Sequence, residues 1–500
     1  MSPESGGLLY GSGIDGYFLH LPSRRGGERA SGRASWRHLL LTIGNGDRLG
    51  LLQRTGYGVT PIRRAIISAV EPAGGRPSQD PWAKLFLGLM LLWAATVPLF
   101  IAVAESAMWL AALVWAIAWV RHEVLPGGAA NDPPVHGPAG DVFGLIGAPV
   151  IGYCAASLLS ATMSRDPIDS LWEVREVFLF VAPMVTYAAF REPRARRWAI
   201  RAFTAGIFIT LAWGLVQTAR AAQSGTFPGT YRPDGPFSHY MTYAGMLMLA
   251  VPLLLAVRNG VTTLLVHLLA AVALAMVGLT MTRSAWLGCV VTLIAYVGCG
   301  LVPARVKADR RPARNWAAYG VTLAVGGIVI SLLLLSLAGQ QALVARGSSI
   351  FSMQNPTNVD RMAMAVTGLR IIAAYPVLGI GPGLMGKVYP AWRVPWAVKE
   401  HNSHLHNNLL QIAAERGLLG LALWLWMMAA FVIGGWRVLR HRGPHGEGGP
   451  EARAALAAAA GFLIMGLFEY NFSDSEVLMA LLFILTLPFA ASAQTEHQGR

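Results

Sequence analysis

Residues 401–420, HNSHLHNNLLQIAAERGLLG, place three histidines, three asparagines, a glutamine and a glutamate directly in front of an apolar segment. Polar side chains at the boundary of a membrane are costly unless they are paired or used. A helix that begins near Asn407 puts Asn407, Gln411 and Glu415 on one face, because these residues recur every four positions. His406 lies one residue ahead of this stripe, where its side chain is free to extend into a cleft. The stretch predicts a functional site at a membrane surface, although an interfacial cap of solvated polar residues is also consistent with it.

The end of the same stretch carries two further expectations. Gly417 and Gly420 follow at helical spacing, which would let another helix approach closely. Arg416 is adjacent to Glu415, and neighbouring residues in a helix do not face each other. Glu415 is therefore expected to find its partner elsewhere or to orient a histidine.

The composition is that of an integral membrane protein. Of 500 residues, 54% are hydrophobic and only 13% are charged, whereas soluble domains carry about 25% charged residues. The net charge of +14 comes mainly from arginines whose positions follow membrane topology, so no nucleic-acid partner is expected. The cysteines lie inside apolar runs and predict neither a disulfide framework nor a metal site: Cys154, Cys289 and Cys299.

The chain divides into a tail and a series of apolar segments. Residues 1–80 are rich in glycine, serine and arginine and predict a basic, mostly disordered tail without the pattern of a signal peptide. Segments close to the ~20 residues that a bilayer requires then follow. We count twelve: 85–103, 106–120, 142–160, 176–190, 199–219, 241–257, 261–281, 285–302, 316–338, 417–436, 454–469 and 476–493. The expected fold is all-α, with nine spans in residues 81–338, a long outer loop at 339–416 and three spans in residues 417–500.

Lysines and arginines in short loops predict the orientation of these spans. The basic loops are 191–197, 305–314 and 437–453. With twelve spans these loops lie on the same side as both termini, which is the cytoplasm. The loops expected on the opposite side are 161–175, 220–240, 282–284, 339–416 and 470–475.

The long outer loop is expected to contain an amphipathic helix at about 360–374 that lies at the membrane interface. Thr357 with Asp360 three residues later resembles a helix start, and Pro376 ends the helix. The apolar stripe at helical spacing consists of Met362, Ala365, Leu369 and Ile372.

The sequence GIGPG at 379–383 follows, with Gly381 and Gly383 among its glycines. No strand precedes it, which argues against a nucleotide-binding loop. We interpret it as a sharp loop that allows another backbone to approach closely.

Two arginines on the outer face contradict the positive-inside bias. Arg232 lies just before a span, and Arg283 lies in a turn too short to be a solvated loop. A guanidinium group binds phosphate through two hydrogen bonds, so these arginines are candidates for a phosphate or diphosphate site. The alternative is that each reaches the lipid headgroups or pairs with a nearby acid such as Asp234. That alternative is favoured for Arg361, Arg370 and Arg416.

Together these segments resemble the O-antigen ligase and polymerase family, bacterial membrane glycosyltransferases that use glycans linked to a polyprenyl diphosphate. The resemblance covers roughly residues 85–490. The matching pieces are RPDG at 232–235, TRSA at 282–285, PVLGIGPG at 376–383, HLHN at 404–407 and ERGLLG at 415–420.

The resemblance implies transfer of a glycan from undecaprenyl diphosphate to an acceptor hydroxyl at the periplasmic face of the inner (cytoplasmic) membrane. The acceptor is the lipid A-core in a ligase and another lipid-linked repeat unit in an O-antigen or exopolysaccharide polymerase. Membrane lipids are the only other partners expected, with no cofactor.

The resemblance also assigns roles to residues. Arg232 and Arg283 would bind the diphosphate, and His406 would act as the catalytic base. The remaining candidates are His404 and Glu415 for catalysis and Arg361, Asn407, Gly381 and Gly383 for the substrate loop.

The chemistry fits this assignment without a metal ion. Arginine donors in a cleft of low dielectric stabilise a leaving diphosphate, and histidine accepts a hydroxyl proton at neutral pH. The His-x-His pair lacks the Cys or Asp cluster that a metal site would need.

A transporter or flippase is the rival from another class. Transporters place ionisable residues near the middle of the membrane. The predicted spans are nearly free of charge, with His267 as the main exception.

Overall fold

The computed structural model describes residues 81–123, 139–227, 231–258, 261–304, 348 and 355–492. The chain divides into two compact units, Met1–Thr60 and Pro61–Arg500, and the described residues all belong to the second. The predicted tail at 1–80 and the predicted span at 316–338 therefore lie outside the described residues.

Every regular element in the described residues is helical, as predicted. In chain order these elements are α4 (Pro81–Thr96), α5 (Ile101–Glu123), α6 (Ala139–Thr162), α7 (Pro167–Glu173), the 3₁₀ helix η1 (Val174–Val181), α8 (Ala182–Phe190), α9 (Pro193–Gln223), α10 (Tyr240–Ala256), α11 (Val261–Leu279), α12 (Arg283–Gly300), α15 (Pro356–Ala374), α16 (Met385–Trp392), α17 (Asn408–Arg442), α18 (Gly449–Met465) and α19 (Ser475–Ser492). Proline is the first residue of α7, α9 and α15. A backbone N–H at this position has no hydrogen-bond partner within the helix, so its absence in proline does not weaken the helix.

Seven of these helices are long and apolar enough to cross a membrane: α5, α6, α9, α11, α12, α17 and α19. The shorter apolar helices α4 and α10 have 16 and 17 residues. The membrane class is thus supported, whereas the count of about twelve spans is not confirmed.

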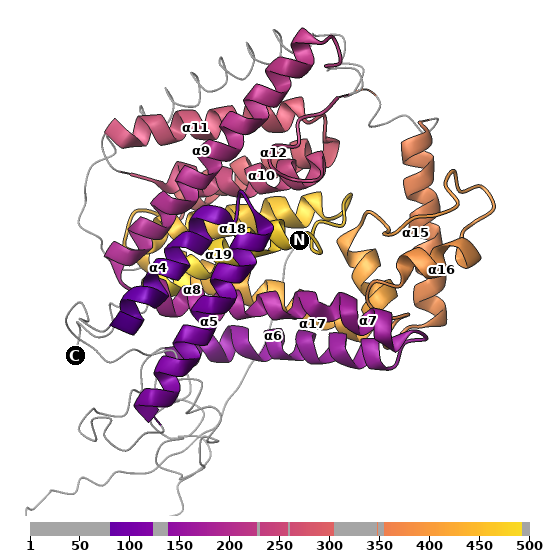
Figure 1. Cartoon of the computed structure of the whole chain (residues 1–500), viewed down its shortest axis with the longest axis horizontal. Helices are drawn as coiled ribbons and strands as arrows, with labels where there is room; N and C mark the ends of the chain where they lie inside the picture. The colour runs from indigo at the N-terminus through magenta and orange to yellow at the C-terminus, as the bar shows by residue number, and fades with distance from the viewer. Residues whose placement is uncertain are drawn as a thin grey trace, which may run out of the picture. The chain divides into compact units, whose positions relative to one another are not determined.

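The core lies around α19 and α10. Both helices are apolar on all sides, as expected for helices surrounded by others, and 83% of the α19 span is buried. They pack on α18, which also packs on α12, while α17 runs beside α6 (Figure 1). The outer helices expose apolar side chains, among them Ile151, Phe208 and Ile294, which suits contact with lipid.

Helix α17 is interrupted at Gly417, where φ is 68°. The chain that follows α15 passes along this interruption. Leu418 N–H donates to Pro376 O (2.7 Å), Ile380 N–H to Ala414 O (2.9 Å) and Gly381 N–H to Glu415 O (2.9 Å). The predicted close backbone approach of the glycine loop is confirmed.

The prediction that Gly417 admits another helix is wrong. A Cβ atom on Gly417 would lie 2.0 Å from Val377 O, so the close neighbour is a loop. The expectation that Glu415 and Arg416 do not pair is also wrong. Their side chains lie 3.1 Å apart and are almost fully buried, because two charges shielded from water need each other as partners.

Helix α15 confirms the predicted element and its end before Pro376, but it begins earlier than expected. Asn355, not Thr357, caps it: Thr357 N–H donates to Asn355 Oδ1 (3.0 Å). Asp360 accepts from Lys399 N–H instead. The side chains of Met362 and Leu369 are exposed, and an interfacial position for α15 stays a prediction.

Candidate active site

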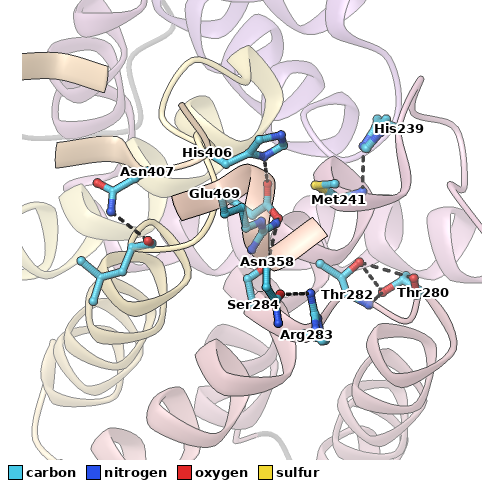
Figure 2. A network of polar contacts seen from close by, with 12 residues as sticks. His239, Met241, Thr280, Thr282, Arg283, Ser284, Asn358, His406, Asn407 and Glu469 are labelled. Carbon is cyan, nitrogen blue, oxygen red and sulfur yellow. Dashed lines mark hydrogen bonds and ion pairs between the residues drawn. The ribbon is translucent and has the colours of Figure 1, made fainter. Parts of the chain in front are cut away.

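Five segments that are distant in the sequence meet at one polar network. They are the loop before α10, the turn between α11 and α12, the first turns of α15, the loop before α17 and the loop after α18. Figure 2 shows the side chains that these segments contribute.

The centre of the network is a histidine–glutamate pair. His406 Nδ1 lies 2.7 Å from Glu469 Oε2. His406 has a φ of 48°, a left-handed conformation that is uncommon outside glycine. The next residue, Asn407, caps α17 by accepting from Leu410 N–H (2.9 Å) and donates to Leu467 O (2.8 Å). Asn407 therefore fixes the loops that carry the pair, rather than extending into the site.

Asn408 strengthens the same junction. Its backbone N–H donates to Gly466 O (2.7 Å), and its side chain donates to Asn471 Oδ1 (2.8 Å). These bonds tie the start of α17 to both sides of Glu469, which places the carboxylate opposite His406.

Glu469 has cationic and polar neighbours on its other oxygen. Arg361 from α15 forms an ion pair with Oε1, and Ser284 Oγ donates to it at 3.5 Å. Burial raises the pKa of this carboxyl, but the hydrogen bond with His406 and the positive charge of Arg361 outweigh burial and hold the pKa below its usual value. Glu469 is therefore ionised at neutral pH. Arg361, for which pairing with lipid headgroups or an acid is the favoured interpretation of the sequence, pairs with an acid inside the network.

The two arginines predicted to bind a diphosphate lie beside this pair. Arg283 opens α12, and its Nη2 donates to Asn358 Oδ1 at 2.9 Å. Arg232 lies with its guanidinium 4.7 Å from the centre of the Tyr240 ring. Asp234, the alternative partner considered for Arg232, accepts from Gln217 Nε2 (2.9 Å).

Positive charge therefore collects at one place. Arg232 and Arg361 both lie near enough to Arg283 to interact with it electrostatically, with Glu469 as an opposing charge. Such an arrangement suits an anionic ligand with more than one phosphate.

His404 differs from His406 in its surroundings. The two rings lie 4.2 Å apart at a steep angle, and His404 also faces Tyr470. Burial lowers the pKa of His404 to about 4, and within the described residues its Nδ1 has no hydrogen-bond partner. A histidine with so low a pKa is a weak base, whereas His406, which is also partly exposed, has a carboxylate partner.

Glu415 belongs to a second network. Its Oε1 accepts from Gln411 Nε2 (2.8 Å) and from Gly383 N–H (3.1 Å), and its Oε2 pairs with Arg416. Gln411 Oε1 in turn accepts from Leu405 N–H (2.7 Å), between the two histidines. The structure thus brings Glu415 to the glycine loop of Gly381 and Gly383, and not into contact with His406.

Sequence reasoning missed Glu469 and Asn358. Glu469 had a usable signal, because it is the last residue of the predicted span 454–469 and an acid at a membrane boundary is costly. Asn358 had none, since an asparagine in the first turn of a helix is ordinary. Among the described residues, no group of three His, Cys, Asp or Glu side chains is placed to hold a metal ion.

Comparison with known proteins finds one family. A family model described as O-Antigen ligase matches residues 268–425, a range that contains Arg283, Arg361, His404 and His406 and ends before Glu469. The comparison with curated proteins finds no match. The family match and the apolar helices together indicate a multi-pass membrane protein.

Proposed function

We propose that the chain belongs to the O-antigen ligase and polymerase family, which the match over residues 268–425 supports. We further propose that it transfers a glycan from undecaprenyl diphosphate to a hydroxyl of the lipid A-core. The family is one of membrane glycosyltransferase enzymes. The reaction would take place at the periplasmic face of the inner membrane, with no metal ion or other cofactor.

The observation that carries the proposal is the contact between His406 and Glu469 inside a cluster of arginines. With His406 Nδ1–H directed at Glu469 Oε2, the lone pair on Nε2 is available to accept a proton. The carboxylate stabilises the imidazolium that forms, and it holds the ring in one orientation.

Residues of the site then account for each step of the transfer. The acceptor hydroxyl loses its proton to His406 Nε2 as its oxygen forms a bond to the anomeric carbon. The bond from that carbon to the diphosphate oxygen breaks, and undecaprenyl diphosphate leaves. Arg232 and Arg283 stabilise the negative charge that develops on the leaving group, which is where fixed donors contribute most. Direct displacement of this kind inverts the anomeric centre, so a product with the donor's configuration would contradict it.

The acceptor is tested in a deletion strain by separating surface lipopolysaccharide and lipid-linked glycans by size. Bare lipid A-core with long glycan on the polyprenyl carrier supports the ligase. Lipopolysaccharide that carries a single repeat unit would instead identify a polymerase. No change in either pool would contradict glycan transfer to these acceptors and favour a transporter.

Complementation with variants tests the site. His406→Ala removes the base and should abolish transfer at matched protein levels. Arg283→Lys should fail as well, because a single ammonium group does not replace a guanidinium that binds through two nitrogens. His401→Ala, an exposed histidine in the same stretch, is the matched control and should restore wild-type polysaccharide. Normal polysaccharide from either site variant would overturn the assignment.

A further inference from the structure

His239 lies at the edge of the site and has a fixed hydrogen-bonding pattern. It is the N-cap residue of α10, and its Nδ1 accepts from Met241 N–H at 3.2 Å. A neutral imidazole that accepts through Nδ1 carries its hydrogen on Nε2. The cap therefore selects the tautomer in which Nε2–H is a donor.

The ring of His239 is held in a stack with Tyr240 and Arg232. The His239 and Tyr240 rings lie 4.3 Å apart with an angle of 30° between their planes, and the Arg232 guanidinium lies 4.7 Å from the same tyrosine ring. His239 is exposed, and no described residue forms a hydrogen bond with its Nε2. The Tyr240 ring thus packs against both the Arg232 guanidinium and the ring that carries the His239 Nε2–H group.

The charges around His239 keep it neutral. Burial of part of the ring lowers the pKa of His239, and the nearby Arg232 lowers it further, against the opposing effects of Glu469 and Asp234. These interactions also show that His239 lies within electrostatic reach of the His406–Glu469 pair. Figure 2 shows His239 and His406 in the same upper part of the network.

We propose that His239 donates a hydrogen bond from Nε2–H to the diphosphate of the lipid-linked donor, beside Arg232. This inference rests on the proposed function and adds a binding residue to it. A neutral donor stabilises charge on the leaving diphosphate without adding a positive charge next to three arginines.

Two substitutions separate donation from helix capping. Asparagine places a side-chain oxygen where Nδ1 lies and is a favourable N-cap, but it has no group at the position of Nε2. Glutamine reaches the position of Nε2 with an amide N–H, but it is a poor cap. We expect His239→Asn to keep the thermal midpoint of the wild type and to lose about 10²-fold in kcat. His239→Gln should show a lower thermal midpoint and recover most of the lost activity.

The experiment uses the full chain in nanodiscs, with undecaprenyl diphosphate as the binding probe and glycan transfer as the second readout. Binding of the probe should weaken about tenfold in His239→Asn and change little in His239→Gln, a difference of one hydrogen bond to a charged group. Ser238→Ala, at the exposed neighbouring position, is the control and should match the wild type.

Each outcome decides at least one of the two proposals. Wild-type probe binding and transfer in His239→Asn would overturn the role of His239 and leave the proposed function standing. Loss of both readouts in both variants, at normal thermal midpoints, would also overturn it, because an amide donor would then not suffice. A wild-type chain that binds the probe with the expected dependence on His239, yet transfers no glycan, would support this inference and contradict the proposed function. A wild-type chain that does not bind the probe would overturn both.

Discussion

The two histidines on either side of Leu405 illustrate how burial decides chemistry at a single residue. His404 has a pKa that partial burial lowers to about 4, so it stays neutral through the physiological range. His406 keeps part of its ring exposed and has Glu469 at 2.7 Å. A base needs access to its substrate and stabilisation of its protonated form, and among these two only His406 has both.

Glu469→Gln tests the carboxylate partner directly. The amide cannot stabilise a protonated His406, so we expect kcat to fall about 10²-fold or more, with a smaller change in KM. The measurement is steady-state transfer by purified protein in nanodiscs. Glu400→Gln, at an exposed carboxylate that pairs with Arg393 away from the site, is the control. A Glu469→Gln protein with wild-type kcat would remove Glu469 from the mechanism.

The direction of the Glu469 pKa shift also predicts how the stability that Glu469 contributes depends on pH. Folding lowers the pKa of the Glu469 carboxyl, so the folded protein favours its ionised form. The stability that Glu469 contributes is therefore fully present above the ordinary pKa of a glutamate. The contribution is lost only as pH falls through the depressed value. The pair with His406 should therefore persist across the neutral range.

Among the elements, the broken helix α17 has the clearest steric requirement. Gly417→Ala would place a Cβ 2.0 Å from Val377 O at a positive φ. We expect this change to lower stability by roughly 1–3 kcal/mol, the usual cost of a strained backbone, before the added contact is counted. Gly298→Ala in α12 meets nothing within 4 Å and is the matched control. Thermal unfolding in detergent checks both, and equal midpoints for the two variants would contradict the steric argument.

The same elements show what the sequence predicts and what it leaves open. The start of α17 at Asn407, the end of α15 before Pro376 and the sharp glycine loop follow from local rules of capping and backbone freedom. The His406–Glu469 contact joins residues 63 positions apart, and Arg361 reaches Glu469 across 108. Periodicity reports only on near neighbours, so contacts of this range depend on how the helices pack.

The junction between α10 and α19 carries a pH-dependent contact. Thr242 Oγ1 donates to Asp474 Oδ2 at 3.0 Å. Burial raises the pKa of Asp474 from 3.8 to about 7, and the hydrogen bond only partly opposes this effect. Because the folded pKa exceeds the unfolded one, the stabilisation is full below about pH 4 and is lost as pH rises through about 7.

Asp474→Asn should remove that dependence. We expect the wild type to lose thermal stability between about pH 4 and 7, and the variant to lose less, because the amide never ionises. Midpoints measured at several pH values in one detergent check this. Asp169→Asn, at an exposed position, should keep the wild-type slope. A slope unchanged by Asp474→Asn would contradict the assignment.

For the whole molecule, the function proposed above depends on which side of the membrane the site faces. Residues 418–442 of α17 extend ~38 Å at 1.5 Å per residue, enough to cross a hydrocarbon core of ~30 Å. The two ends of α17 should therefore lie on opposite sides. The basic residues at its C-terminal end, Arg437, Arg440 and Arg442, predict that this end is cytoplasmic.

Cysteine accessibility tests this orientation. His401→Cys and His441→Cys are both at exposed positions, the first in the loop before α17 and the second in its last turn. They are introduced into a chain whose three cysteines are replaced by alanine and which still restores surface polysaccharide. A membrane-impermeant maleimide added to spheroplasts should label the cysteine at 401 at once and the one at 441 only after lysis. The reverse pattern would place His406 and Glu469 in the cytoplasm, where a donor presented at the periplasmic face is out of reach, and the proposed reaction would then be wrong.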